Sequence, residues 1–267
     1  MLTIHPIPAF NDNYIWAIIN NDTKQAIIVD AGDAAPVLDF LTQHHLSLSQ
    51  LWITHHHNDH IGGASELANQ FPEAVVYAHA NIHPLINVTN LQAVGEGSVL
   101  DVWGHNVEVW QTAGHTENHI AYLLTWDNRL NIFCGDTLFR AGCGRVFTGT
   151  IDELYASFDR FNELHDADTL FYPAHEYTLS NLKFAQSVAP TNVDIQAAID
   201  SDSQKRAQGL PTLPTSLAEE RKINPFMMII DNPNTTELIT QVNAQLPGTG
   251  DAPFEVFSAL RELKNRF

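Results

Sequence analysis

The sequence is poor in basic residues and contains no long apolar run. Lysine and arginine together number 13 against 31 aspartates and glutamates, which gives a formal net charge of −18. Such a charge repels a nucleic-acid backbone at long range, so we expect no nucleic-acid partner. No apolar segment is long enough to span a bilayer, and the opening residues, MLTIHPIPAF, lack the basic and apolar regions of a secretory signal. We therefore predict a cytoplasmic protein with no membrane partner.

Cysteine is also scarce, since Cys134 and Cys143 are the only two in 267 residues. Two cysteines are too few for a disulfide scaffold in a chain of this length. We predict instead one buried thiol and one thiol in a loop.

The few basic residues are unevenly distributed along the chain. Lys24 is the only lysine or arginine before Arg129. The C-terminal quarter, in contrast, contains Lys205, Arg206, Arg221, Lys222, Arg261, Lys264 and Arg266. An anionic ligand is therefore expected to find its partner in this part of the chain.

Two regions of different character follow one another in the sequence. Residues 1–175 contain short β-branched and aromatic runs, such as NYIWAIIN, QLWITH, HIAYLLTW and RLNIFCGD, which predict strands. After His175 the apolar spacing becomes helical. Helices are predicted at Ala34–His45, Asp152–Leu164, 178–189, 192–208 and 253–264. The change predicts a β-rich domain over residues 1–175 and a helical domain over residues 176–267.

The segment QLWITHHHNDHIGG combines an apolar strand, ending at Thr54, with a cluster of histidine and aspartate. Alternate side chains of an extended segment share a face, so His55 and His57 can hold one metal ion while the histidine between them points away. Asp59 and His60, past the bend and before a glycine pair that opens a helix, can reach a second ion. The pattern H-x-H-x-D-H arises by chance in roughly a few of a thousand such chains.

Three further segments supply the ligands that two metal ions would still need. His115 in TAGHTENH, Asp136 in FCGDTLF and His175 in YPAHEY each follow the end of a predicted strand. A set of histidines and aspartates without cysteine favours borderline to hard divalent ions. We predict two divalent metal ions per chain, zinc in the first place, with iron and manganese as alternatives.

Several motifs resemble a known family. T-H-x-H-x-D-H, together with His115, Asp136 and His175, resembles the metallo-β-lactamase superfamily. Within it, GDTLFRAGCGR, AHEYTLSNLKFA, SLAEERKINPF and ALRELKNRF resemble hydroxyacylglutathione hydrolases, also called glyoxalase II, over essentially the whole chain. The resemblance implies an α/β (α+β) fold, an αββα sandwich with a C-terminal helical domain that binds substrate. It also implies hydrolysis of S-(2-hydroxyacyl)glutathione, such as S-D-lactoylglutathione, to glutathione and a 2-hydroxy acid such as D-lactate, the second step of methylglyoxal detoxification.

The resemblance also implies a role for individual residues. His55, His57 and His115 would hold the first metal ion, Asp59, His60 and His175 the second, and Asp136 would bridge both. Asp59 and Asp136 would thereby act in catalysis with a metal-bridging hydroxide. The glutathione contacts of the family map onto Arg145, Phe147, Tyr177, Arg261 and Lys264. We expect a monomer whose partner is the small glutathione thioester.

Two positions depart from the family pattern. Relatives often have tyrosine where this chain has Phe147, so a hydroxyl contact to glutathione is absent or replaced here. Many relatives have glutamate at the position of Thr148. These departures concern the affinity for substrate rather than the reaction.

The expected chemistry is metal-assisted hydrolysis. Two ions roughly 3.5–4 Å apart can share a hydroxide that forms near neutral pH, and one ion can stabilise the oxyanion of the attacked thioester. A thiol with a pKa near 8.5 leaves readily as thiolate, so no dedicated general acid is required.

Alternatives to this hypothesis stay open. A glutathione-dependent persulfide dioxygenase also carries the H-x-H-x-D-H segment and would use one iron, and a non-catalytic metal-binding module would use the ions only structurally. Arg261 and Lys264, spaced i, i+3 on a terminal helix, could merely stabilise the helix C-terminus. Tyr177 could only pack beside the metal site, and the GCGR and NPF segments could be plain turns or loops.

Overall fold

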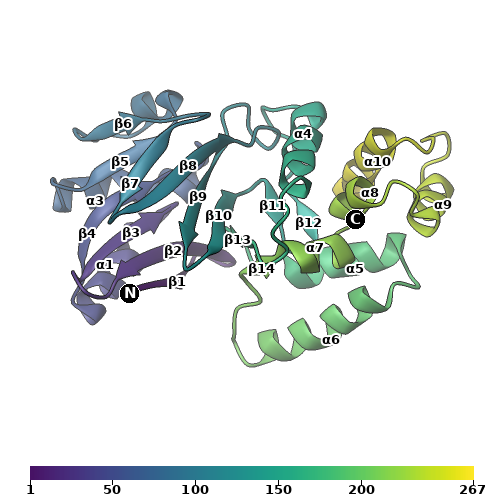
Figure 1. Ribbon diagram of the computed structural model, residues 1–267, viewed down its shortest axis with the longest axis horizontal. Coiled ribbons are helices and arrows are strands. Elements are labelled where there is room, and N and C mark those ends of the chain that lie inside the picture. Colours follow the sequence, from purple (N-terminus) through teal and green to yellow (C-terminus); the bar gives the residue numbers. More distant parts are fainter.

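The computed structural model describes residues 1–267 and has the form of a two-sheet sandwich followed by a helical region (Figure 1). The first sheet has the strand order β1-β2-β3-β4-β5-β6. Its strands are β1 (Leu2–Ala9), β2 (Asn13–Asn20), β3 (Gln25–Val29), β4 (Ser47–Trp52), β5 (Val75–Ala78) and β6 (Leu91–Ala93). β1, β2 and β3 pair antiparallel, whereas β3 to β6 pair parallel.

The second sheet has the strand order β14-β13-β10-β9-β8-β7. Its strands are β7 (Val99–Val102), β8 (His105–Gln111), β9 (Ile120–Trp126), β10 (Arg129–Gly135), β13 (Leu170–Pro173) and β14 (Thr215–Ser216). Between β10 and β13 the chain forms a small hairpin of β11 (Leu138–Phe139) and β12 (Gly142–Cys143), which pair only with each other.

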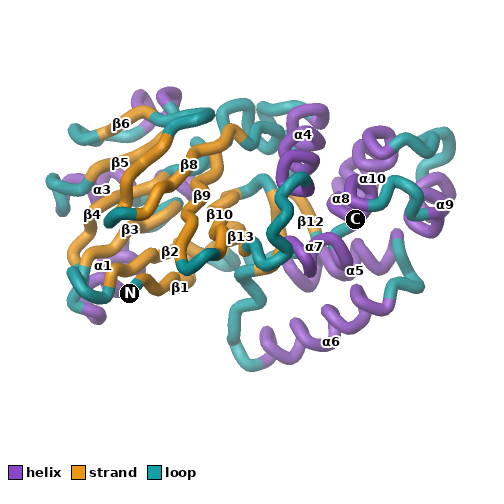
Figure 2. Tube along the Cα trace, viewed as in Figure 1, coloured by secondary structure: helices purple, strands orange, loops and turns teal.

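Helices cover both outer faces of the sandwich and continue into the C-terminal region (Figure 2). Those of the sandwich are α1 (Ala34–His44), α2 (Asn58–Ile61), α3 (Ala64–Gln70), the 3-10 helix Ala80–Leu85 and α4 (Ile151–Asn162). The C-terminal region contains α5 (Thr178–Val188), α6 (Val193–Ala207), α7 (Leu217–Ile223), α8 (Pro225–Asp231), α9 (Thr236–Gln245) and α10 (Pro253–Arg266). None of these helices has the length and apolar character that a membrane span requires.

Successive side chains of a strand point to opposite faces of its sheet, and this alternation produces the layers of the sandwich. In β2, Ile15 and Ile19 face the core beneath α1 and α3, while Trp16 and Ile18 face the core between the two sheets. A third core joins the outer face of the second sheet to α4 and the C-terminal helices, where Phe171 of β13 is buried with side chains from both regions. The predicted αββα sandwich with its C-terminal helical region is therefore confirmed.

Most predicted elements are confirmed, with shifted ends. The strand NYIWAIIN coincides with β2, and α1 begins after Asp33, whose side chain accepts the N–H of Ala35. The strand predicted to end at Thr54 ends at Trp52, because the N–H and hydroxyl of Thr54 both bond the Asp30 carboxylate rather than a neighbouring strand.

The prediction of one buried and one loop thiol is wrong. Cys134 lies in β10 and Cys143 in β12, and both are buried. The hairpin that carries Cys143 is covered by the C-terminal helices, which its local sequence does not reveal.

Candidate metal centre

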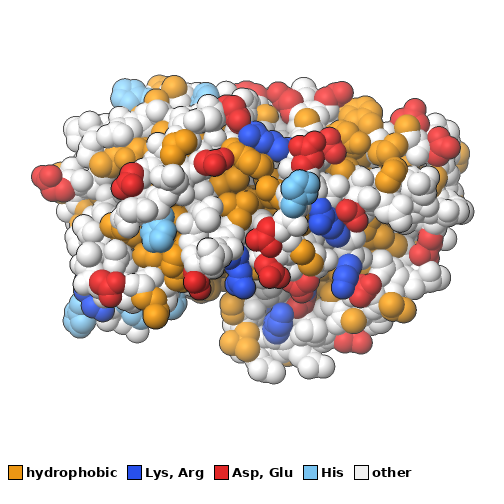
Figure 3. All heavy atoms as spheres, in the orientation of Figure 1, with side chains coloured by type: hydrophobic (Ala, Val, Ile, Leu, Met, Phe, Trp, Pro, Cys, Tyr) orange, Lys and Arg blue, Asp and Glu red, His pale blue; other side chains and the backbone are white.

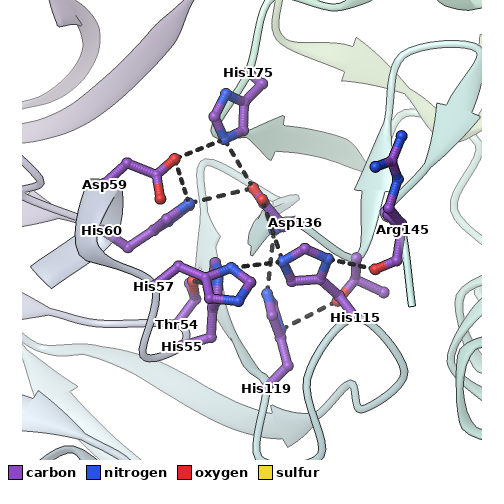
Figure 4. A network of polar contacts seen from close by, with 12 residues as sticks. Thr54, His55, His57, Asp59, His60, His115, His119, Asp136, Arg145 and His175 are labelled. Carbon is purple, nitrogen blue, oxygen red and sulfur yellow. Dashed lines mark hydrogen bonds and ion pairs between the residues drawn. The ribbon is translucent and has the colours of Figure 1, made fainter. Parts of the chain in front are cut away.

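The seven predicted ligands meet at one edge of the sandwich, past the ends of four strands (Figure 4). His55 and His57 lie in the loop after β4, Asp59 and His60 in the short helix α2, His115 in the loop after β8, Asp136 after β10, and His175 after β13. Loops that leave a rigid sheet hold polar side chains in place and leave them facing a cleft.

The first group consists of three histidines and one oxygen of Asp136. Nδ1 of His57 lies 3.0 Å from Nε2 of His55 and 3.0 Å from Nε2 of His115. Oδ2 of Asp136 lies 3.5 Å from Nε2 of His115. One atom from each of these four residues lies within 4.8 Å of the others, so they could hold one metal ion.

The second group combines two histidines with two carboxylates. Oδ2 of Asp59 lies 3.6 Å from Nε2 of His60 and 3.3 Å from Nε2 of His175. Oδ1 of Asp136 lies 3.5 Å from Nε2 of His60 and 3.4 Å from Nε2 of His175. The two oxygens of Asp136 therefore face different groups, which is the geometry of a bridging carboxylate.

The arrangement fits divalent metal ions. Tetrahedral bonds of about 2.0–2.1 Å place neighbouring ligand atoms about 3.3 Å apart, close to the separations of both groups. Nε2 of His60 and Oδ1 of Asp136 are also buried without a hydrogen-bond partner. Buried polar atoms rarely stay unpaired in folded proteins, so their convergence indicates a ligand position. The donor atoms are nitrogen and oxygen without thiolate, a set that also suits divalent ions.

Polar contacts outside the two groups orient several ligands. Nδ1 of His60 lies 3.0 Å from the buried Asp30 carboxylate, and Nδ1 of His175 lies 2.8 Å from Asp12. Nδ1 of His115 is 2.7 Å from the carbonyl oxygen of Arg145. Such partners fix which ring nitrogen is free, here Nε2 in all three cases, and so preorganise the site for metal.

Two glycines allow the supporting loops to approach the ligands. A Cβ at Gly32 would lie 1.9 Å from the carbonyl oxygen of Asp59, and one at Gly144 would lie 1.9 Å from that of Asp136. Because these contacts involve backbone, neither loop could hold any other residue without moving a ligand.

His119 is a residue of this site that the sequence analysis missed. It is fully buried, its Nε2 accepts the backbone N–H of Asp136 at 3.1 Å, and its Nδ1 lies 3.0 Å from the hydroxyl of Thr112. Its ring also stacks on His55 at 4.8 Å. The second histidine of TAGHTENH was the available signal, but spacing alone does not separate a ligand from a supporting residue.

The two groups differ in electrostatics. Burial lowers the pKa of His115 to about 4 and that of His55 well below the usual range, so both rings are neutral. Burial opposes charge on His60 as well, but Asp136 and Asp30 raise its pKa to about 10. The first group thus offers neutral nitrogen donors. In the second group, carboxylates stabilise the positive charge of the histidines.

A pocket of ≈ 270 Å³ lies next to the metal centre and gathers most of the predicted glutathione contacts. It is lined by Phe139, Cys143, Arg145, Tyr177, Ser180, Asn181, Arg261, Lys264 and Phe267. Tyr177 connects the pocket to the centre, since its ring stacks on His175 at 4.7 Å. The cations of the pocket are notable on a chain this acidic, whose visible face carries scattered acidic groups (Figure 3).

Two of the predicted glutathione contacts differ from the others: one lies outside the pocket, and the other already bonds backbone carbonyl oxygens. Phe147 is 58% exposed, lies outside this pocket and packs edge-on against His57 and His115. Arg261 lines the pocket, but its Nη1 donates to the carbonyl oxygens of Cys143 and Gly144. Thr148 contacts Glu117 at the surface.

Comparison with known proteins agrees with this fold. Residues 11–186 match the metallo-beta-lactamase superfamily, the class of protein that the sandwich and its metal centre define. The crystal structure of ETHE1 from Myxococcus xanthus is similar, with a TM-score of 0.62 and 25% identity, and the match covers 97% of this chain and 99% of that one.

More specific matches extend over the whole chain. Residues 176–267 match the family described as hydroxyacylglutathione hydrolase C-terminus. The hydroxyacylglutathione hydrolase of Neisseria meningitidis serogroup A / serotype 4A is 44% identical over 266 residues, and that of Vibrio campbellii is 43% identical over 267 residues, each covering 100% of both chains. The chain belongs to the hydroxyacylglutathione hydrolase family.

Proposed function

We propose that this chain hydrolyses S-(2-hydroxyacyl)glutathione, with S-D-lactoylglutathione as the expected substrate, to glutathione and a 2-hydroxy acid. The observation that carries the proposal is the Asp136 carboxylate, whose two oxygens face two separate ligand groups beside a cationic pocket. The family membership and the names of its relatives support the same reaction. Such a reaction would be the second step of methylglyoxal detoxification.

Each ligand group is assigned one divalent ion. His55, His57 and His115 would hold the first, Asp59, His60 and His175 the second, and Asp136 both. When bound, the ions lower the pKa of water and act as Lewis acids towards the thioester carbonyl. We propose zinc, with iron or manganese as alternatives, because nitrogen and carboxylate donors suit all three.

The residues of the chain would recognise the glutathione moiety. Arg145 and Lys264 offer charge to the carboxylates of glutathione, and the buried Arg261 adds a positive potential behind them. Tyr177, stacked on His175, would place the thioester sulfur near the second ligand group. The leaving thiolate needs no protein acid, because its own pKa is near 8.5.

The two proposed roles belong to successive regions of the chain. We infer that residues 1–175 carry the metal centre and that residues 176–267 act as the substrate-binding domain, since Tyr177, Arg261 and Lys264 come from the latter. The cytoplasmic location and the monomeric state stay predictions.

The experiment compares S-D-lactoylglutathione with a simple thioester of the same acyl group that lacks glutathione. Release of thiol at a much higher kcat/KM from the glutathione thioester supports the proposal. Equal kcat/KM for both would contradict recognition of glutathione, and uptake of dioxygen with glutathione persulfide would favour the dioxygenase alternative.

A further inference from the structure

The β11–β12 hairpin forms one wall of both the metal centre and the pocket. Phe139 of β11 lies 5.7 Å from the ring of His175 and 5.2 Å from that of Tyr177. Phe139 and Cys143 line the pocket, and Gly144 packs directly against Asp136. A shift of this hairpin would therefore move the surface on which glutathione is expected to lie.

The hairpin has little support of its own. It consists of two residues per strand joined through Arg140 and Ala141, and Ala141 has a φ of 56°, in the left-handed region. A two-stranded ribbon this short is not stable alone in water. Its backbone groups must find partners elsewhere, because they are buried.

Asn224 provides some of these partners. It is fully buried at the N-terminus of α8, where its side-chain oxygen accepts the N–H of Phe226 at 3.1 Å. Its amide nitrogen donates to the carbonyl oxygens of Phe139 at 3.3 Å and Gly142 at 2.9 Å. One side chain thus caps a C-terminal helix and ties both strands of the hairpin to it.

Glu220 of α7 provides a further hydrogen-bond partner for the backbone of the hairpin. Its Oε2 accepts the N–H of Ala141 at 2.9 Å and the amide of Asn224 at 2.9 Å, and its Oε1 accepts the hydroxyl of Thr215 at 2.6 Å. The carboxylate is fully buried among these three donors. An ionised carboxylate accepts all of them, whereas a protonated one replaces an acceptor with a donor.

The charges around Glu220 come from three elements. Arg140 of the hairpin turn bonds Asp202 of α6 at 2.7 Å and lies 3.3 Å from Glu219 of α7, and Lys205 of α6 lies 3.1 Å from Asp202. Burial raises the pKa of Glu220 to about 7, although Arg140 opposes this shift.

We propose that Glu220 and Asn224 are positioning residues for the glutathione pocket, which act by fixing the β11–β12 hairpin without touching substrate. The inference rests on the proposed function, because the pocket is taken as the glutathione site. It gives the buried polar residues of SLAEERKINPF a role in substrate affinity rather than in a plain loop.

The test uses two conservative variants and one matched control. E220Q keeps the shape of the side chain and removes an acceptor. N224S replaces the capping amide oxygen with a hydroxyl that can still cap the helix, and it removes the amide nitrogen that reaches the hairpin. N192S makes the same change at the cap of α6, where the amide of Asn192 donates to the carbonyl oxygen of Lys222 in α7. It therefore removes a cap amide and a contact to α7 without removing a hydrogen bond to the hairpin.

Affinity is measured as the Kd of S-methylglutathione for the metal-loaded protein, alongside kcat, KM and bound metal. We expect E220Q and N224S to raise Kd and KM roughly tenfold, about 1.4 kcal/mol, with two metals retained and kcat changed less than threefold. N192S should leave Kd within twofold of the wild type.

A pH profile supplies a second measurement. In the wild type, Kd should rise as the pH falls below about 7, as Glu220 gains a proton, and E220Q should show no such rise. Folded E220Q and N224S with the wild-type Kd would overturn the positioning role. A wild-type protein that binds no S-methylglutathione would contradict the proposed function itself.

Discussion

Asp136 is the residue on which the two-metal hypothesis depends most. Its Oδ1 and Oδ2 each lie 3.4–3.5 Å from histidine nitrogens of different groups. Asp136→Ala should therefore lose both ions and reduce hydrolysis to the background rate, as measured by elemental analysis and thiol release. Retention of two ions per chain by this variant would refute the bridging role.

Asp59 provides the matched comparison, because it faces only the second group. Asp59→Ala should deplete the second ion selectively and leave about one metal ion per chain. Loss of both ions to the same extent would contradict the assignment of Asp59 to a single group.

The proposed role of Lys264 predicts that substrate binding depends on pH. Burial and the neighbouring Arg261 lower the pKa of Lys264 to about 8, so the ammonium is present at pH 7 and disappears as the pH rises through about 8. KM for the thioester should rise between pH 7 and 9 in the wild type. Lys264→Arg, which stays charged, should flatten this rise, whereas a rise that persists in this variant would show that another group titrates.

Single residues show where sequence reasoning succeeds. The convergence of the seven histidines and aspartates could be predicted because each follows a strand in a compact motif, and four of them, His55, His57, Asp59 and His60, lie within six positions. Asp30, Asp12 and His119 could not, since each acts through a partner that the fold brings in from a distant part of the chain.

At the scale of elements, α4 supports the loop that carries His115. The hydroxyl of Ser157 in α4 donates to the carbonyl oxygen of Ala113, and a Cβ at Gly114 would collide with Leu154 of the same helix. The helix begins with a capping box in which Thr150 and Glu153 exchange side-chain and backbone hydrogen bonds.

Removal of this cap should lower stability without altering the metal centre. Thr150→Ala should reduce the free energy of unfolding by about 1 kcal/mol, because it leaves an N–H of the first turn without its partner. Thr150→Ser, which keeps the hydroxyl, serves as the control in a denaturant titration. An unchanged midpoint in Thr150→Ala would show that the cap contributes nothing.

Elements also mark the limit of prediction from sequence. β2 and α1 have strong local patterns and were predicted nearly to the residue, whereas β11, β12 and β14 have two residues each and no detectable pattern. The β11–β12 hairpin, for example, is bonded by Asn224 and Glu220, which lie more than 75 positions further along the chain. Cys143 was misplaced for the same reason.

At the scale of the whole molecule, the two proposed domains share a hydrophobic core. Phe171 and Ile132 of the second sheet lie in the same buried cluster as Phe184, Phe226 and Phe257 of the C-terminal helices. Separation of the regions would expose this apolar surface to water, at a cost of about 25 cal/mol per Å².

The shared core predicts that both regions unfold together. Scanning calorimetry of the metal-loaded protein should show one transition in which loss of the sheet and of the helices coincide. Two well-separated transitions would contradict the shared core and favour independently folding domains.

The central claim is that bound metal and glutathione thioester hydrolysis belong to one site. The most direct measurement follows thiol release from S-D-lactoylglutathione while bound metal is counted, before chelation, after it and after metal is restored. We predict that activity disappears with the ions and returns as two per chain are restored. Hydrolysis that persists after both ions have been removed would contradict the account.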